Sequence, residues 1–164
     1  MILFTNFCFV LEYILLEISG EITPERMKGW SQSKNSTQLW TGLVIETRFD
    51  AVQSNIIGSW NVSSMNQGTL EVVKQEMARV NIDILGISEL KWTGMGEFNS
   101  DDHYIYYCGQ ESLRRNGVAI MVNKRVQNAV LGCNLKNDRM ISVHFQGKPL
   151  SSVQFSHSVV TDSL

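Results

Sequence analysis

Two polar residues, Asn61 and Glu89, stand at the carboxyl ends of the two most regular apolar segments of the chain. Residues 56–62 and 82–87 each predict a short strand, so the two side chains stand at strand carboxyl ends. Neighbouring strands lie about 4.8 Å apart, which lets an amide and a carboxylate converge on one small ligand or ion. Mg²⁺ accepts one or two carboxylates, with water and phosphate completing its octahedron, so Glu89 is a sufficient anchor. The alternative is a solvated glutamate at a strand end.

An amphipathic helix separates these two strands. Its apolar positions recur at helical spacing in Leu70, Val73, Met77 and Val80. Strand, helix and strand within about thirty residues form a βαβ unit, whose right-handed crossover brings both carboxyl ends to one edge of a sheet. The spacing therefore predicts a helix over residues 69–80 that places Asn61 and Glu89 side by side.

The second half of the chain is rich in strand signals. Four runs are predicted to form an antiparallel meander: residues 104–108, 118–123, 129–135 and 140–146. Residues 93–102 are rich in Gly, Asn, Ser and Asp and predict a loop. A βαβ unit followed by antiparallel strands predicts a mixed α/β sandwich.

The patterning divides the chain into three parts. Residues 56–149 form the predicted domain, residues 1–55 an unassigned extension, and residues 150–164 a divergent tail. The apolar residues 1–16 include Asn6 and Glu12 and fall short of the about 20 residues that span a bilayer, so no membrane partner is expected. The first basic residue is Arg26, which disfavours a signal peptide.

Charge is unevenly distributed along the chain. The net charge of −2 excludes a generally basic nucleic-acid binder. Residues 104–149 nevertheless hold seven basic and two acidic side chains, whereas residues 57–103 hold three basic and seven acidic ones. A basic half beside a cation site would suit a phosphate ligand, so weak binding of DNA is the partner that we expect; solvated surface charge is the alternative.

The three cysteines, Cys8, Cys108 and Cys133, are far apart and show no CxxC or CxxH spacing. Neither a disulfide framework nor a zinc site is predicted. A reducing compartment, nuclear or cytosolic, is favoured over secretion.

Several segments resemble a known superfamily. Ser59-Trp60-Asn61-Val62 and the run Ile84-Leu85-Gly86-Ile87-Ser88-Glu89-Leu90-Lys91 resemble the opening of the endonuclease/exonuclease/phosphatase superfamily, and Gly117-Val118-Ala119-Ile120 resembles its next strand. Residues 60–149, which are 90 of the 164 residues, are similar to the endonucleases of RTE/BovB-type non-LTR retrotransposons. They are equally similar to the craniofacial development protein 2-like sequences related to those elements.

The resemblance implies a four-layer α/β sandwich of which this chain holds an incomplete, N-terminal part. It implies a catalytic pair in which Asn61 positions a scissile phosphate and Glu89 binds Mg²⁺ or Mn²⁺. The later motifs of the family, a Tyr-bearing strand, G-D-x-N and a terminal Asp-His, have no match after Pro149. The resemblance therefore implies a truncated, inactive endonuclease-like protein of retrotransposon origin. The alternative is a metal-dependent DNA endonuclease whose missing half is supplied elsewhere.

The histidines offer no general base. Ser100-Asp101-Asp102-His103 superficially resembles the terminal motif of the family, but its position predicts an exposed loop cluster. His144 alternates within a predicted strand and His157 lies in the tail, so both are expected to be surface or packing residues.

Overall fold

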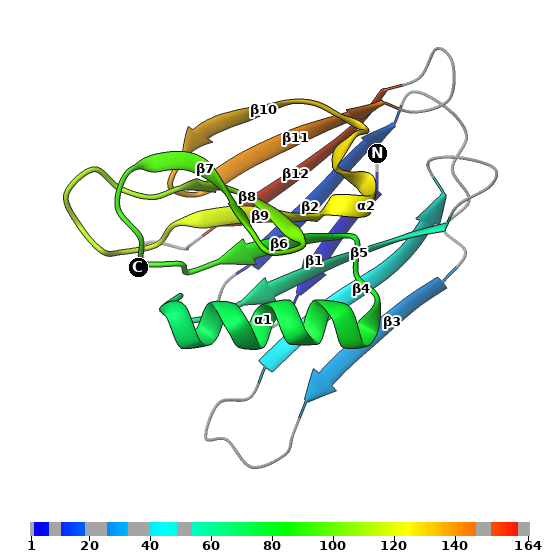
Figure 1. Cartoon of the computed structure of the whole chain (residues 1–164), viewed down its shortest axis with the longest axis horizontal. Helices are drawn as coiled ribbons and strands as arrows, with labels where there is room; N and C mark the ends of the chain where they lie inside the picture. Colours follow the sequence, from blue (N-terminus) through cyan, green and yellow to red (C-terminus); the bar gives the residue numbers. More distant parts are fainter. Residues whose placement is uncertain are drawn as a thin grey trace.

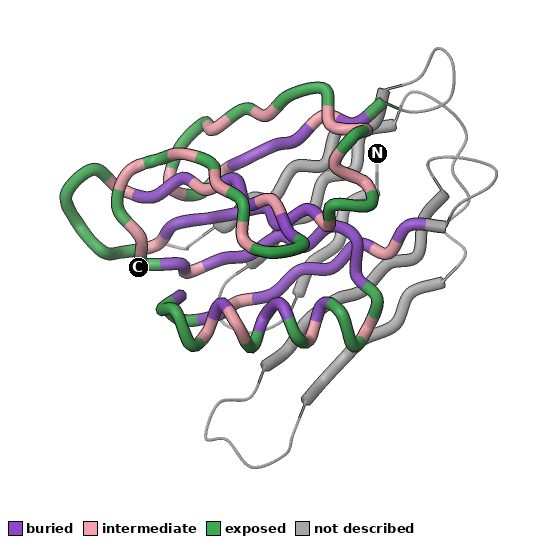
Figure 2. Tube along the Cα trace, in the orientation of Figure 1, coloured by how far each residue is buried: buried purple, intermediate pink, exposed green. Residues whose placement is uncertain are grey.

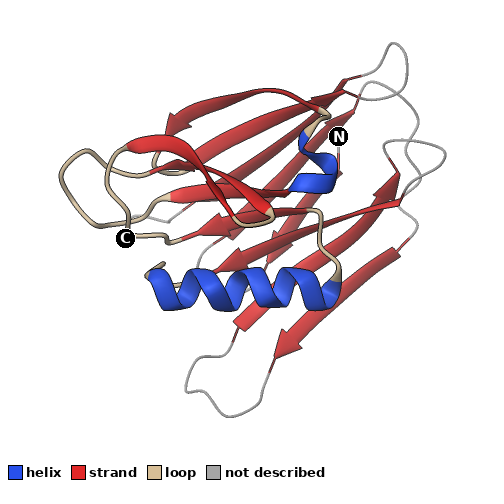
Figure 3. Ribbon diagram, in the orientation of Figure 1, coloured by secondary structure: helices blue, strands red, loops and turns tan. Residues whose placement is uncertain are grey.

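The structure is a computed structural model that describes the backbone of residues 2–6, 11–18, 26–32, 40–48, 54–146 and 152–160 and the side chains of residues 55–146. Strands dominate it, and the helices are few (Figures 1 and 3). The elements follow in the order β1 (Ile2–Asn6), β2 (Leu11–Ile18), β3 (Arg26–Gln32), β4 (Trp40–Arg48), β5 (Ser54–Asn61), α1 (Gln67–Val80), β6 (Ile84–Ser88), β7 (Met95–Ser100), β8 (His103–Cys108), β9 (Val118–Asn123), α2 (Lys124–Gln127), β10 (Val130–Asn137), β11 (Met140–Gln146) and β12 (Ser152–Val160).

The strands form two sheets. A seven-stranded sheet has the order β3-β4-β5-β6-β9-β8-β7, and a five-stranded sheet has the order β1-β2-β12-β11-β10. β5 and β6 are parallel neighbours joined by α1, whereas the other strand pairs are antiparallel. The predicted βαβ unit and the mixed α/β class are therefore confirmed.

Local sequence explains where α1 begins and ends. The side chain of Asn66 caps the helix by accepting a hydrogen bond from the backbone N–H of Thr69 at 2.9 Å. Asn81 ends it in the left-handed conformation, with φ 62°, and its N–H returns to the carbonyls of Met77 and Ala78. The helix begins two residues before the predicted start because the cap lies at Asn66. Neither helix of the described part is long and apolar enough to cross a membrane.

The side chains of residues 55–146 form a core in two parts, one on each face of the seven-stranded sheet. One face packs against α1, where the buried stripe of Leu70, Val73 and Met77 meets side chains of β5, β6, β8 and β9. The other face packs against β11 of the five-stranded sheet. Figure 2 shows the buried residues following the central strands β6, β8 and β9. All five residues of β6 are buried, which explains its nearly continuous apolar sequence.

Two local predictions are wrong. The predicted loop over residues 93–102 contains β7, an edge strand whose side chains alternate between exposed and half-buried. The predicted single meander is divided, because β8 and β9 belong to the seven-stranded sheet and β10 and β11 to the five-stranded one. The short helix α2 makes the change of sheet; Asn123 caps it by accepting from the N–H of Arg125 at 3.0 Å.

Strands also lie in the ranges predicted as extension and tail. The backbone of β4 pairs with β5, and that of β12 pairs with β11 and β2. The division of the chain at residues 55 and 149 stays a prediction, which deletion of residues 1–53 followed by limited proteolysis of the remaining chain tests.

Candidate ligand-binding site

Asn61 and Glu89 meet at one edge of the seven-stranded sheet. Asn61 is the last residue of β5 and pairs in register with Ser88, the last residue of β6, so Glu89 follows at the same level. Asn61 Nδ2 donates a hydrogen bond to Glu89 Oε1 at 3.1 Å, and both residues are half-buried. The predicted convergence of these two side chains is confirmed, and their functional roles stay predictions.

The backbone around this pair is held in an unusual conformation. Ser63, Glu89 and Lys91 have φ values of 55°, 55° and 57°, in the left-handed region that costs residues other than glycine of order 1 kcal/mol each. Hydrogen bonds keep them there. The N–H of Lys91 donates to the Asn116 carbonyl at 2.7 Å, and the Asn61 Oδ1 accepts from the N–H of Ser63 at 3.0 Å. The fold therefore fixes the direction in which Glu89 leaves its strand.

The donor set around Glu89 limits the ion that it could hold. Residues 55–146 contain no group of three His, Cys, Asp or Glu side chains close enough to share a metal ion. A tetrahedral zinc site therefore does not fit this part of the chain. A single carboxylate does fit Mg²⁺ or Mn²⁺, which complete their octahedron with water and ligand phosphate.

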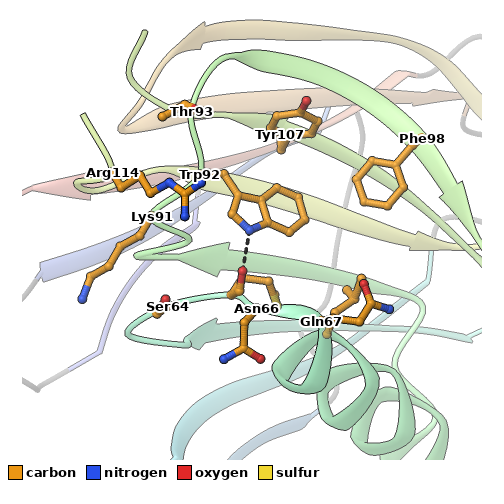
Figure 4. A pocket seen from close by; sticks show the side chains of 11 residues that line it. Ser64, Asn66, Gln67, Lys91, Trp92, Thr93, Phe98, Tyr107 and Arg114 are labelled. Atoms are coloured by element: carbon orange, nitrogen blue, oxygen red, sulfur yellow. Dashed lines mark hydrogen bonds between the residues drawn. The ribbon is translucent and has the colours of Figure 1, made fainter. Parts of the chain in front are cut away.

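A groove is lined in part by the residues that come directly after the pair in the chain, together with side chains of α1, β7, β8 and the loop after β8. Figure 4 shows its lining side chains, and its volume is about 570 Å³. The residues that line it are Ser64, Met65, Asn66, Gln67, Leu70, Lys91, Trp92, Thr93, Phe98, Tyr107 and Arg114. It begins three residues after Asn61 and two residues after Glu89. The sequence pattern does not reveal the groove, because its aromatic members come from three separate segments.

Aromatic rings form one wall of the groove. The centroid of the Trp92 ring lies 5.2 Å from that of Tyr107 in an edge-to-face arrangement and 5.9 Å from that of Phe98. Trp92 Nε1 donates to the backbone carbonyl of Met65, which fixes the indole against the loop after β5 (Figure 4). Gly109 is needed behind this wall, since an added Cβ would lie 2.0 Å from the Trp92 carbonyl oxygen.

The predicted cluster at residues 100–103 is partly corrected. Asp101 and Asp102 are exposed, but His103 begins β8 and is only 5% exposed. Neither ring nitrogen of His103 has a hydrogen-bond partner among the described residues, and burial lowers the pKa of this histidine. The ammonium of the buried Lys74 pairs with Asp101 and donates to Ser100 Oγ at 3.2 Å. The cluster is a structural contact between α1 and the β7–β8 hairpin, and His103 is not an exposed loop residue.

The basic half of the chain does not form one free surface. Arg125 pairs with the buried Asp83, and Lys124 lies 4.0 Å from Asp102. Arg114 and Arg115 are exposed and make no ion pair with any described residue. Of these two arginines, Arg114 lines the groove and can therefore reach a ligand bound there.

The remaining titratable candidates are packing residues or lie outside the described side chains. Burial raises the pKa of both Cys108 and Cys133, so neither thiol is activated as a nucleophile. His144 is half-buried in β11. Cys8 and His157 belong to residues whose side chains the structure does not describe.

Comparison with known proteins finds two similar curated sequences. Both are named Craniofacial development protein 2, one from Tragulus javanicus and one from Bos taurus, and each is 82% identical over 95 residues. The match covers 58% of this chain but only 17% and 16% of those two proteins, so the chain spans about a sixth of their length. No protein-family profile matches the chain, and no solved structure matches it.

These names correct the functional identification made from the sequence. The similar curated proteins carry the name Craniofacial development protein 2 and not that of a retrotransposon endonuclease. The assignment to RTE/BovB-type elements is therefore wrong as an identification, as is the description of the chain as a truncated, inactive endonuclease-like protein. Its alternative, a DNA endonuclease completed by a missing half, is not supported either.

Proposed function

We propose that the described domain is a DNA-binding module in which Glu89, oriented by Asn61, holds a Mg²⁺ or Mn²⁺ ion against a phosphate of the ligand. The observation that carries the proposal is the 3.1 Å hydrogen bond between Asn61 Nδ2 and Glu89 Oε1 at the carboxyl ends of adjacent parallel strands. Open α/β sheets bind their ligands at this edge. The proposal contains no hydrolytic step.

Each polar atom of the pair has a separate task. Glu89 accepts from Asn61 through Oε1, which leaves Oε2 and the remaining lone pairs for a cation. The Asn61 amide has two N–H hydrogens, of which one is used by Glu89, so the second can donate to a phosphate oxygen. Its Oδ1 is engaged by the N–H of Ser63, which fixes the orientation of the amide. When bound, the cation would supply positive charge that neutralises the phosphate.

Nearby basic side chains support the same ligand class. Arg114 and Lys91 are exposed and line the groove, and each can contact a backbone phosphate and release its counterions. Two such contacts are few, so the affinity is low and falls with added salt. The acidic net charge of the chain agrees with a local rather than a general attraction for DNA.

We also propose the finer architecture, a four-layer sandwich in the longer relatives. The described part supplies a helix and two stacked sheets. A further helical layer on the outer face of the five-stranded sheet would complete the four layers. A structure of a full-length relative with no helix on that face would contradict this arrangement.

The cation site is tested by titrating the full chain with Mn²⁺ and measuring the free ion by electron paramagnetic resonance. Glu89→Gln keeps the size of the side chain and the hydrogen-bonding capacity toward Asn61 but removes the charge. We expect this variant to lose most of the Mn²⁺ binding of the parent. Glu111→Gln is the matched control, because it removes an exposed carboxylate outside the pair. Equal loss in both variants, or none in Glu89→Gln, contradicts the site.

A further inference from the structure

The groove combines a fixed aromatic wall with an opening to solvent. Trp92, Phe98 and Tyr107 are each half-buried, and the three rings contact one another, with centroids 5.2 to 6.1 Å apart. The hydrogen bond from Trp92 to the Met65 carbonyl removes the rotational freedom of the indole. A ligand that stacks on this wall therefore orders few side chains on binding.

The charge around the groove has one sign. Lys91 and Arg114 line it, both are exposed, and neither makes an ion pair with a residue of the described part. No Asp or Glu from the described side chains belongs to the lining. The first turn of α1, which contributes Gln67, also contains no acidic residue that would neutralise the positive end of the helix dipole. The groove therefore complements a ligand that is both planar and anionic.

We propose that this groove binds a nucleotide unit of single-stranded DNA, with the base stacked on the wall of Trp92, Phe98 and Tyr107 and the flanking phosphates held by Lys91 and Arg114. Aromatic stacking together with basic side chains along the backbone is how proteins hold single strands without sequence preference. A duplex keeps its bases paired and stacked, so it cannot offer one to the wall. The inference rests on the proposed function in that it places the same ligand at the same sheet edge, but it needs no cation.

The experiment compares two single-stranded probes of equal length and charge, a fluorescein-labelled oligo(dT) and the corresponding abasic oligomer. Binding to the full chain is measured by fluorescence anisotropy in EDTA, so that no cation contributes. We expect oligo(dT) to bind at least about tenfold more tightly than the abasic oligomer, because stacking one base is worth that factor or more. Unlabelled oligo(dT) should also quench the emission of Trp92, and the quenching should be absent in Trp92→Phe.

Substitutions at two exposed arginines form a matched pair, because neither side chain is part of the hydrophobic core. Arg114→Gln should weaken binding of both probes, whereas Arg115→Gln, which changes the charge equally outside the groove lining, should weaken it less. Equal affinity of the parent for the two probes would overturn the stacking proposal, and so would equal effects of the two arginine variants. A different result would contradict the proposed function alone. In that case, Glu89→Gln would leave the Mg²⁺-dependent part of DNA binding unchanged, and the preference for oligo(dT) in EDTA would persist.

Discussion

Each end of the parallel pair β5–β6 holds a carboxylate, but the two carboxylates differ in burial and in their partners. At the amino end, Asp83 is fully buried, accepts from the N–H of Ile56 at 2.9 Å and pairs with Arg125. At the carboxyl end, Glu89 is half-buried and forms no ion pair within the described part of the chain. A buried carboxylate whose partners the fold supplies is costly to leave without them, whereas a carboxylate without an ion pair is available to a ligand.

The largest effect on stability is expected at the amino end. Arg125→Met removes the guanidinium that pairs with Asp83 and also bonds to the side chain and carbonyl of Asn81. Asp83 would remain as an uncompensated buried carboxylate, which costs about 3 kcal/mol, the lower end of the usual range because the Arg125 side chain is 38% exposed. Urea unfolding measures the change. A loss below about 1 kcal/mol would show that the pair does not hold this end together.

A slightly smaller loss is expected at one glycine beside the groove. Gly109→Ala would bring a Cβ to 2.0 Å from the Trp92 carbonyl oxygen, so the backbone must move. Such overpacking costs about 1–3 kcal/mol. The aromatic wall would shift with it, which near-ultraviolet circular dichroism detects. Gly132→Ala is the control, since nothing lies within 4 Å of its added Cβ, and its stability should match that of the parent.

A pH-dependent effect is expected at His103, which belongs to neither end. Burial lowers its pKa below the ordinary value of 6.5, so the folded state holds the neutral ring. As the pH falls, the unfolded chain binds the proton first. The free energy of unfolding therefore declines below about pH 6.5, whereas the contribution of the neutral ring is fully present above that pH. Urea unfolding between pH 7.5 and about pH 5 should show this decline. His103→Phe should reduce it, and an unchanged pH dependence would contradict the assignment.

The smallest effect on stability is expected at the carboxyl end. Glu89→Gln changes a half-buried residue that no ion pair within the described part requires, so the free energy of unfolding should change by less than about 0.5 kcal/mol in the absence of divalent ions. A loss as large as that of Arg125→Met would remove the contrast between the two ends. Glu89 would then be a structural residue.

The sequence predicts the elements that position Asn61 and Glu89 because their patterns are strong and local. β6 is buried on both faces and therefore continuously apolar, and the buried stripe of α1 repeats at helical spacing. The hydrogen bond between Asn61 and Glu89 follows from that topology. The resemblance of sequence segments to a known family, in contrast, led to a functional identification that the names of the similar proteins do not support.

The sequence does not predict β7, the division of strands between the sheets, or the groove. β7 lies at a sheet edge and buries no residue fully, so its pattern of Gly, Asn and Ser resembles a loop. Which sheet a strand joins depends on long-range packing, such as that of Ile141, Val143 and Phe145 against the seven-stranded sheet. The aromatic wall needs the pairing of β7 with β8, which brings Phe98 beside Tyr107.

The most direct test of the account is the effect of Mg²⁺ on DNA binding at constant ionic strength, measured by fluorescence anisotropy for the parent chain and Glu89→Gln. Constant ionic strength holds the general screening fixed, and the Glu89→Gln variant controls for Mg²⁺ that associates with the DNA itself. The account predicts that Mg²⁺ raises the affinity of the parent and does not raise that of Glu89→Gln. An equal response of the two proteins to Mg²⁺ would contradict it, because the ion would then act somewhere other than Glu89.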